Sequence, residues 1–134
     1  MEIFPPKKIK IVEIENKGRG VVATEKILKN EIIEHCAVIV LGERDLAFIE
    51  NKDKTDTLYH YYLYQPEFKR NIIMLGYGSL YNHSFEPNAE VDYEDDPKIK
   101  QIYFRAIKDI EKGEEIIFNY SFDNDIVEFL PNEK

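Results

Sequence analysis

The hydrophobic and polar positions of the chain alternate over short runs, which is the pattern of half-buried β-strands. The clearest run is KIKIVEI at residues 8–14, and further runs rich in β-branched and aromatic residues lie at residues 20–23, 31–41, 100–106 and 115–120. Such residues favour extended backbone on a pleated surface. The sequence therefore predicts a mainly β fold built from short strands.

Helical periodicity is weak along the whole chain. Residues 45–50 are long enough for one or two helical turns, and residues 53–64 pass from charged to aromatic positions, as in a loop that enters a strand. No clear period follows Gln65. The acidic segment DYEDDPK at residues 92–98 is typical of an exposed hairpin loop. We therefore expect little helix.

One short pattern occurs twice. Residues 23–33 read ATEKILKNEII, and residues 106–117 read AIKDIEKGEEII. In each copy a strand ends, the chain turns at Asn30 or Gly113, and a new strand begins. Asn and Gly tolerate positive φ, which suits both residues to that turn position. The sequence predicts one supersecondary unit used twice, because two copies are too few for a solenoid.

The chain has 134 residues, the size of one domain, and 43% of them are hydrophobic, enough for a core without disulfides. Its one cysteine, Cys36, can form no internal disulfide and excludes a cysteine-rich zinc cluster within this chain. The spacing of the three histidines also gives no support for a metal site. The start, MEIFPPKK, lacks the pattern of a signal peptide, and no apolar run has the length of a membrane span. We expect an intracellular protein without a metal and without a membrane association.

The net charge is −8, from 26 acidic and 18 basic residues. Such a surface repels nucleic acid and suits a basic partner. Taken alone, the charge is explained more simply by solubility. We therefore expect no direct contact with nucleic acid.

Two glycine-containing motifs have simple explanations when each is considered alone. KGRG at residues 17–20 lets the backbone turn sharply and approach a ligand, but it is also an ordinary β-turn. It lacks the third glycine and the helix of a dinucleotide-binding loop. KGEEIIFNY at residues 112–120 is a glycine turn followed by a strand that ends on Tyr120, and a tyrosine at that position is usually a packing residue.

The stretch YNHSFEPNAEV at residues 81–91 places His83 between Asn82 and Ser84. Neighbouring side chains rarely form a nucleophile–base pair, and no acidic residue is placed to orient the histidine ring. The simplest interpretation is a capped polar turn that ends at Pro87-Asn88.

The three motifs together are far more specific than any one of them. KGRGVVA, NHSFEPNAEV and KGEEIIFNY follow one another in the order found in SET-domain protein lysine methyltransferases. The chain resembles a minimal member of that family, similar in size to the compact viral and bacterial members. The resemblance covers residues 9–122, approximately.

The resemblance implies a fold, a reaction and a cofactor. The fold is a β-clip of small twisted sheets in which the C-terminal segment passes under a preceding loop, forming a pseudoknot. Residues 1–134 would form one SET domain, with its core at residues 9–122 and a C-terminal lid or tail at residues 123–134. The cofactor is S-adenosylmethionine (SAM), which leaves as S-adenosylhomocysteine, and the target lysine enters from the opposite face through a narrow channel.

Site residues carry over from the same motifs. Tyr120 matches the catalytic tyrosine. Phe118 matches a position that tunes how many methyl groups fit, and phenylalanine there favours di- or trimethylation. Tyr77 and Tyr62 are candidates for the wall of the lysine channel, although core packing is the simpler role for most aromatic residues at 59–64. The cofactor-binding positions are Lys17, Gly18, Arg19, Gly20, Asn82, His83, Tyr120 and Phe122.

The chain also departs from the family pattern. Many histone-directed members carry a zinc-binding cysteine cluster after the SET core, and this chain has none there. Phe122 or Phe129 would have to act as the lid instead. Leu80-Tyr81 stands where an Arg-Phe pair is common, so Lys17 or Arg19 would contact the carboxylate of the cofactor.

Three hypotheses follow for the function. The first is a SAM-dependent lysine methyltransferase acting on a basic, lysine-containing protein or peptide such as a histone. The others are a SET-like module that binds a peptide without catalysis, and an unrelated β-clip domain that binds a small ligand. The first would place the protein in the cytoplasm of a microbe, or in the nucleus if it is eukaryotic or viral. The abundance of aromatic residues leaves room for a homodimer.

Overall fold

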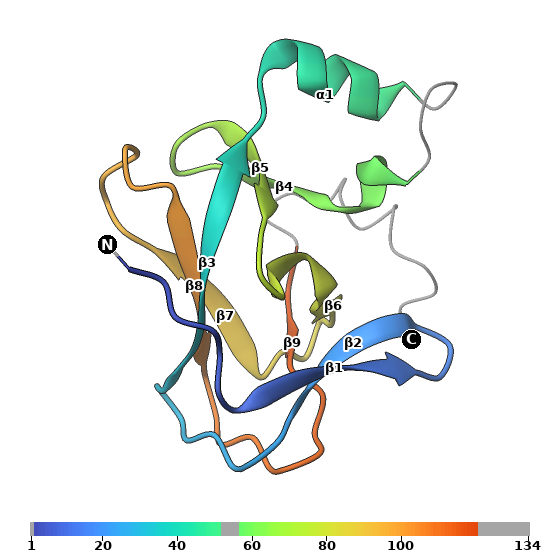
Figure 1. Cartoon of the computed structure of the whole chain (residues 1–134), viewed down its shortest axis with the longest axis vertical. Helices are drawn as coiled ribbons and strands as arrows, with labels where there is room; N and C mark the ends of the chain where they lie inside the picture. Colours follow the sequence, from blue (N-terminus) through green and yellow to red (C-terminus); the bar gives the residue numbers. More distant parts are fainter. Residues whose placement is uncertain (1, 52–56, 121–134) are drawn as a thin grey trace.

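The computed structural model describes residues 2–51 and 57–120. Within them the chain forms nine strands, one α-helix and two short 3-10 helices (Figure 1). The strands are β1 (Ile9–Ile14), β2 (Gly18–Ala23), β3 (Ile32–Val40), β4 (Tyr62–Gln65), β5 (Arg70–Met74), β6 (Asn82–His83), β7 (Ala89–Tyr93), β8 (Gln101–Ala106) and β9 (Ile117–Phe118). The helices are α1 (Glu43–Glu50), η1 (Leu58–His60) and η2 (Gly78–Leu80).

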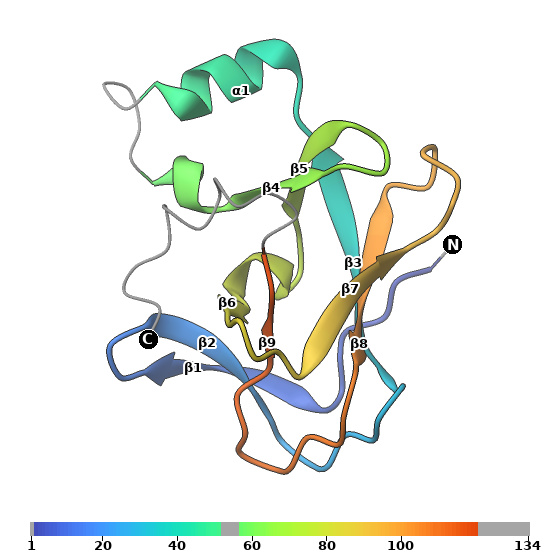
Figure 2. The same cartoon turned by 180° about the vertical axis from the view of Figure 1, so that it is seen from behind.

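The strands form three small sheets. β1 and β2 make an antiparallel hairpin, and β4-β5-β3-β8-β7 make a five-stranded antiparallel sheet. β6 and β9 pair in parallel. In Figures 1 and 2 the β1–β2 hairpin lies beside β6 and β9, at the end of the molecule opposite α1. The prediction of a mainly β fold of small twisted sheets is confirmed.

Four of the predicted strands form close to their expected bounds, namely β1, β2, β3 and β8. The fifth is shorter, since only Ile117 and Phe118 of the expected 115–120 run form a strand. The expected helical turns at residues 45–50 extend to the eight residues of α1.

Three strands are missed by local pattern: the two-residue β6, which lies in the expected polar turn, and two strands of the five-stranded sheet. β5 lies between β3 and β4, where its neighbours supply hydrogen bonds on both sides despite the irregular pattern after Gln65. β7 includes Asp92 and Tyr93, which the sequence places in an exposed loop, and Asp92 lies directly opposite Tyr103 of β8. Pairing with β8 overrides the low strand propensity of Asp92.

The two copies of the repeated pattern pair with each other. Ile27 and Ile110 are both fully buried and exchange backbone hydrogen bonds of 2.9 and 2.8 Å. The turns after them adopt the expected left-handed backbone, with φ of 74° at Asn30 and 88° at Gly113. The predicted repeat is therefore confirmed, and its copies meet in the core.

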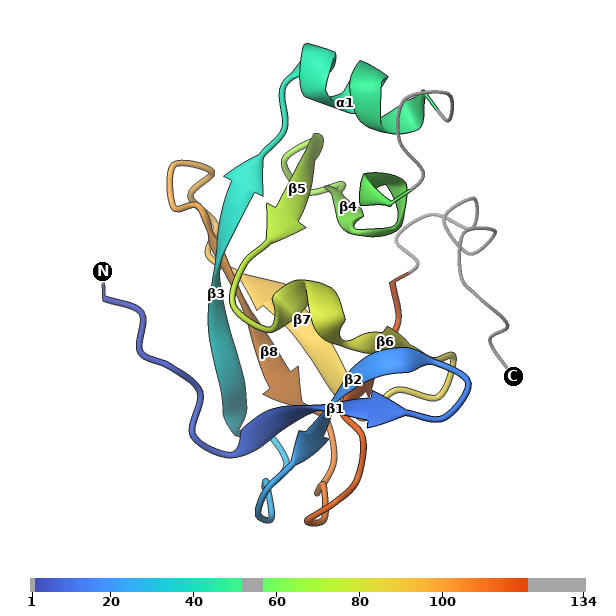
Figure 3. The ribbon, with the colours of Figure 1, turned by 45° about the vertical axis from the view of Figure 1, so that its right-hand side comes forward.

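The C-terminal part of the described chain passes under the loop at residues 82–88. Beyond the parallel pairing of β6 with β9, Ser84 N–H donates to the carbonyl of Phe118 at 3.0 Å, and Asn88 N–H donates to the carbonyl of Ile117 at 3.1 Å. Both ends of the loop, at Ser84 and at Asn88, therefore donate hydrogen bonds to β9, and this is the crossing expected of a pseudoknot. Figure 3 shows η2 leading into β6 beside β2.

Candidate functional site

The glycine motif at residues 17–20, called the glycine turn below, faces Asn82. Lys17 ends the turn after β1, but Gly18 already begins β2 and pairs with Ile14, so the ordinary β-turn expected at these residues is corrected to the start of a strand. Gly18 has φ of +78°, a backbone conformation that favours glycine. At Gly20 the constraint is space, because a Cβ would lie 2.2 Å from Ile14 Cδ1 and 2.8 Å from Asn82 Nδ2. A side chain at Gly20 would therefore displace the ends of the Ile14, Asn82 and Glu115 side chains.

Glu115 joins the turn to β6, and sequence reasoning missed it. Its carboxylate accepts hydrogen bonds from Lys17 Nζ at 3.0 Å and from Asn82 Nδ2 at 2.6 Å. Asn82 Nδ2 also donates to the carbonyl of Arg19 at 3.1 Å. Lys17 and Asn82 therefore bind one partly buried carboxylate, and Asn82 connects it to the backbone of Arg19. The only sequence signal was the acidic pair after Gly113, which looked like a common turn.

Tyr120 lies against His83, as expected of the pseudoknot. The backbone N–H of Tyr120 donates to Nδ1 of His83 at 3.0 Å, and the two rings are 5.2 Å apart. The hydroxyl of Tyr120 donates to the carbonyl of Tyr81. The catalytic candidate is therefore fixed at its backbone and at its hydroxyl by the residues on either side of Asn82.

Phe118 is almost fully buried, with 1% of its surface exposed. Its ring lies 4.8 Å from that of Tyr120 and 5.0 Å from that of Phe104. It therefore backs the Tyr120 ring from the core side. Its predicted effect on methylation number stays a prediction.

The two channel candidates lie in different surroundings. Tyr77 precedes η2 and packs partly buried against the core. Tyr62 on β4 contacts the ring of Tyr59, and its hydroxyl faces Glu50 of α1 at 3.4 Å. Burial, and then the negative charge of Glu50, raise the pKa of Tyr62 to about 12. The structure therefore groups Tyr62 with α1 and η1.

Glu34 of β3 lies beneath the turn that carries Tyr77. Its carboxylate accepts hydrogen bonds from Tyr77 N–H at 2.9 Å and from the Tyr81 hydroxyl at 2.7 Å. Burial raises the pKa of Glu34 despite these two bonds. Burial and the nearby Glu34 carboxylate also raise the pKa of the Cys36 thiol, which keeps that thiol protonated and unreactive.

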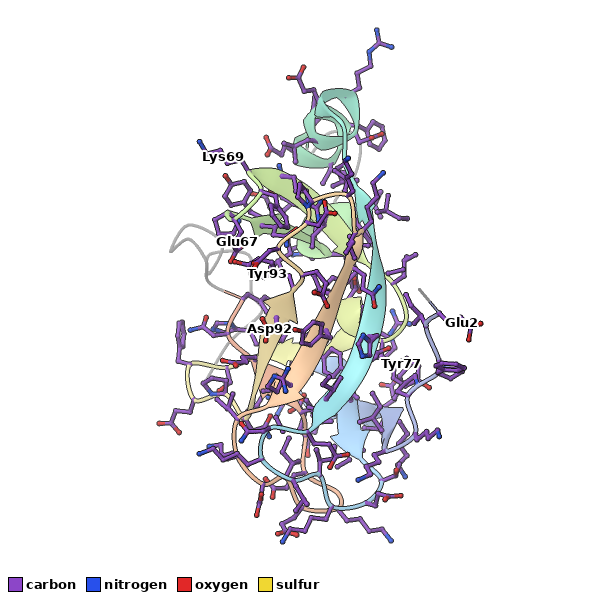
Figure 4. All side chains as sticks on the ribbon, turned by 90° about the vertical axis from the view of Figure 1, so that its left-hand side faces the viewer. Glu2, Glu67, Lys69, Tyr77, Asp92 and Tyr93 are labelled. Carbon is purple, nitrogen blue, oxygen red and sulfur yellow. The ribbon has the colours of Figure 1, made fainter. Side chains whose placement is uncertain are left out.

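Acidic groups gather on another flank of the molecule. Figure 4 shows Tyr93 between Glu67 and Asp92 beside β7. Partial burial, followed by the charges of Glu67, Asp95 and Asp92, raises the pKa of Tyr93. This flank adds a local negative field to the net charge of −8.

Other predicted features are only partly covered by the structure. Phe122, Phe129 and the proposed lid at residues 123–134 lie outside the described residues. Within residues 2–51 and 57–120, no three His, Cys, Asp or Glu side chains are grouped so as to hold a metal ion. None of the helices in that part of the chain is long and apolar enough to cross a membrane.

Known proteins are similar to this chain in sequence. A family model described as SET domain matches residues 18–121. The chain is 30% identical over 112 residues to a Schizosaccharomyces pombe protein named histone-lysine N-methyltransferase, H3 lysine-37 specific, covering 84% of this chain and 72% of that protein. It is 32% identical over 122 residues to a Candida albicans histone-lysine N-methyltransferase, H3 lysine-36 specific, covering 87% of this chain but only 14% of that relative.

A solved structure agrees with the sequence matches. The crystal structure of a Plasmodium falciparum protein described as a candidate histone methyltransferase superimposes with a TM-score of 0.66 at 32% identity, covering 88% of this chain and 96% of that one. The family model spans the glycine turn, the Asn-His pair and Tyr120, which the structure brings together. The chain belongs to the SET domain family.

Proposed function

We propose that this chain is a SAM-dependent protein lysine N-methyltransferase. One observation carries the proposal: the hydroxyl of Tyr120 is directed at the carbonyl of Tyr81, immediately next to Asn82 and the glycine turn. Membership of the SET family and the names of the relatives support the same reaction. The substrate class is a lysine-containing protein, and the net charge of −8 suits a basic one such as a histone.

The residues around Gly20 fit a cofactor of this kind. The space that a Cβ at Gly20 would fill lies 2.8 Å from both Asn82 Nδ2 and Glu115 Oε2. The Glu115 carboxylate and the carbonyl of Arg19 offer acceptors for an ammonium group, while Asn82 Nδ2 and the Lys17 side chain offer donors for a carboxylate. A ligand that carries both groups, as the methionine end of SAM does, matches this donor and acceptor set.

When bound, SAM would supply an electrophilic methyl group attached to a positively charged sulfur. A neutral lysine nitrogen would accept this methyl group, and the electron pair of the broken carbon–sulfur bond would stay on sulfur. Free lysine has a pKa of roughly 10.4, so it must lose a proton to solvent first. An apolar, water-poor channel favours the neutral amine. The ring of Tyr120, which packs on the buried Phe118, supplies apolar surface of this kind next to the site.

Tyr120 acts by alignment. Its hydroxyl donates to the carbonyl of Tyr81 and can orient reacting groups through its oxygen. Its backbone bond to His83 and its hydroxyl bond to Tyr81 hold it in one place before substrate arrives. Fixed alignment of this kind lowers the barrier because the reacting atoms need no further ordering.

The proposal is tested by incubating the chain with SAM labelled in its methyl group and with core histones or a cell lysate. Transfer of label to a lysine, located by mass spectrometry, supports it and names the substrate and the methylation state. Isothermal titration with SAM separates the alternatives. Binding without transfer would indicate a SET-like binding module, and no binding would indicate another β-clip ligand domain.

A further inference from the structure

Glu34 is a buried carboxylate that the proposed reaction does not use. It lies on β3, opposite Phe104 of β8, with 3% of its surface exposed. Burying a charge is costly unless hydrogen bonds compensate for lost water. Here Oε1 accepts from the Tyr81 hydroxyl and Oε2 accepts from the backbone of Tyr77.

These two bonds hold both ends of one turn. Tyr77 immediately precedes η2 and Tyr81 immediately follows it, while Leu80 N–H donates to the Tyr77 carbonyl at 2.8 Å within the turn. Gly76 has φ of +67°, and a Cβ there would lie 2.6 Å from Glu34 Oε2. The chain therefore approaches the carboxylate closely, at a backbone conformation that favours glycine.

The anchored turn leads directly into the site. The carbonyl of Tyr81 accepts a hydrogen bond from the hydroxyl of Tyr120. The ring of Tyr81 packs on the ring of Phe104, 4.1 Å away, and its hydroxyl donates to Glu34. Asn82 is held separately, by β9 and by Glu115. The Glu34 carboxylate therefore influences the positions of Tyr77 and of the Tyr120 hydroxyl more directly than that of Asn82, which lies at the proposed cofactor site.

We propose that Glu34 is a positioning residue for methyl transfer, whose carboxylate fixes both ends of the turn at residues 77–81 and so sets the place of the Tyr120 hydroxyl. The inference rests on the proposed function for its kinetic consequence. Removal of the carboxylate slows transfer and leaves SAM affinity nearly unchanged. Its structural consequence, loss of order in the turn, is independent of catalysis.

Three variants of the full chain test this inference. Glu34→Ala removes both bonds. Glu34→Gln keeps them, because its carbonyl can accept from Tyr77 and its amide can donate to the freely rotating Tyr81 hydroxyl. Gln65→Leu is the matched control. Gln65 lies on β4, is as buried as Glu34 with 3% of its surface exposed, and accepts a hydrogen bond from Arg70 Nε at 2.8 Å.

We expect Glu34→Ala to lower kcat by at least about 10-fold, with the Kd for SAM within about twofold of wild type. Glu34→Gln should stay within about threefold of wild type in both, as should Gln65→Leu. Hydrogen exchange should show the amides of Tyr77 and Leu80 losing protection in Glu34→Ala alone. Impairment of Glu34→Gln equal to that of Glu34→Ala, or a kcat loss no larger than in Gln65→Leu, would overturn the inference.

The exchange measurement separates this inference from the proposed function. If the wild-type chain transfers no methyl group, the proposed function fails while the amides of Tyr77 and Leu80 still report on the anchor. Protection unchanged in Glu34→Ala would overturn the anchor even in an active enzyme. Protection lost there and retained in the other two variants would support it.

Discussion

The backbone N–H of Tyr120 donates to Nδ1 of His83 across 3.0 Å. Because Nδ1 accepts this bond, a neutral His83 carries its proton on Nε2. The histidine that the sequence places in a simple polar turn therefore holds the backbone of the catalytic candidate. The arrangement joins two motifs that are 37 positions apart in the chain.

Removing the hydroxyl of Tyr120 should separate binding from transfer. We expect Tyr120→Phe to keep SAM affinity and to lose about 100-fold or more in methyl transfer, because alignment by the hydroxyl is lost while the ring still packs on Phe118. Titration calorimetry and a labelled-methyl assay measure the two effects. Tyr103→Phe on β8 is the control, and full activity in Tyr120→Phe would refute the catalytic assignment.

A side chain at Gly20 should close the proposed cofactor site. The added methyl of Gly20→Ala would meet Ile14, Asn82 and Glu115 at 2.2 to 2.8 Å. We expect the Kd for SAM to rise by about 10-fold or more, a loss of at least about 1.4 kcal/mol. At Gly42 an added Cβ meets only Asp45, at 3.4 Å, so Gly42→Ala should bind SAM normally. Equal affinities in the two variants would argue against this site.

Lys17 should contribute a charge to cofactor binding. We expect Lys17→Met to weaken SAM binding by about 5- to 10-fold, and the difference from wild type to shrink as salt concentration rises. Lys10→Met is the control, since Lys10 is exposed on the neighbouring strand β1. Calorimetry at two salt concentrations measures both effects. If only Arg19→Met weakens binding, the charge comes from Arg19 instead.

Asn88 should stabilise the crossing of β9 under the loop. Its side chain accepts from Ile117 N–H at 2.9 Å and donates to the carbonyl of Glu115 at 2.8 Å, and only 5% of the residue is exposed. Asn88→Ala leaves both backbone groups unsatisfied, so we expect a loss of about 2–4 kcal/mol in the free energy of unfolding. Urea unfolding measures the change.

Asn71→Ala provides the comparison for Asn88, because Asn71 lies on β5 and takes no part in the crossing. It should cost less than about 1 kcal/mol. A similar loss at both positions would mean that the bonds to β9 add nothing beyond an ordinary substitution.

Glu34 should make stability depend on pH in a particular direction. Its pKa is raised by burial, so the folded chain binds this proton more tightly than the unfolded chain. The free energy of unfolding therefore gains a contribution at low pH that is lost as pH rises from about 4.3, the ordinary value for glutamate, through the raised pKa. Tyr81 and Cys36 also face Glu34, and burial raises the pKa of both groups, so they titrate above this window.

Urea unfolding of wild type and Glu34→Gln across that pH range tests this dependence. The difference between the two curves isolates Glu34 from groups of opposite sign, such as Glu31, whose pKa is lowered chiefly by its hydrogen bond to Lys8. We expect the stability of Glu34→Gln to rise relative to wild type as pH increases. Parallel curves would show that Glu34 titrates normally.

Sequence patterns predicted where many of the strands lie, but not which strands pair with each other. The runs that became β1, β2, β3 and β8 alternate or are rich in β-branched residues, so local pattern was enough to find them. β5 and β7 were missed because their strand state comes from neighbours in the five-stranded sheet. The same limit applied to Glu115, whose partners Lys17 and Asn82 are remote in sequence.

The sequence by itself determined the fold class, the repeated turns at Asn30 and Gly113, and the family through the order of its three motifs. Those properties depend on local backbone preference and on residue identity. Only the tertiary structure decided that the repeats pair at Ile27 and Ile110, that His83 holds Tyr120, and that Glu34 anchors the turn before Asn82. Each of these depends on hydrogen bonds between segments far apart in the chain, which form only when the shared core brings them together.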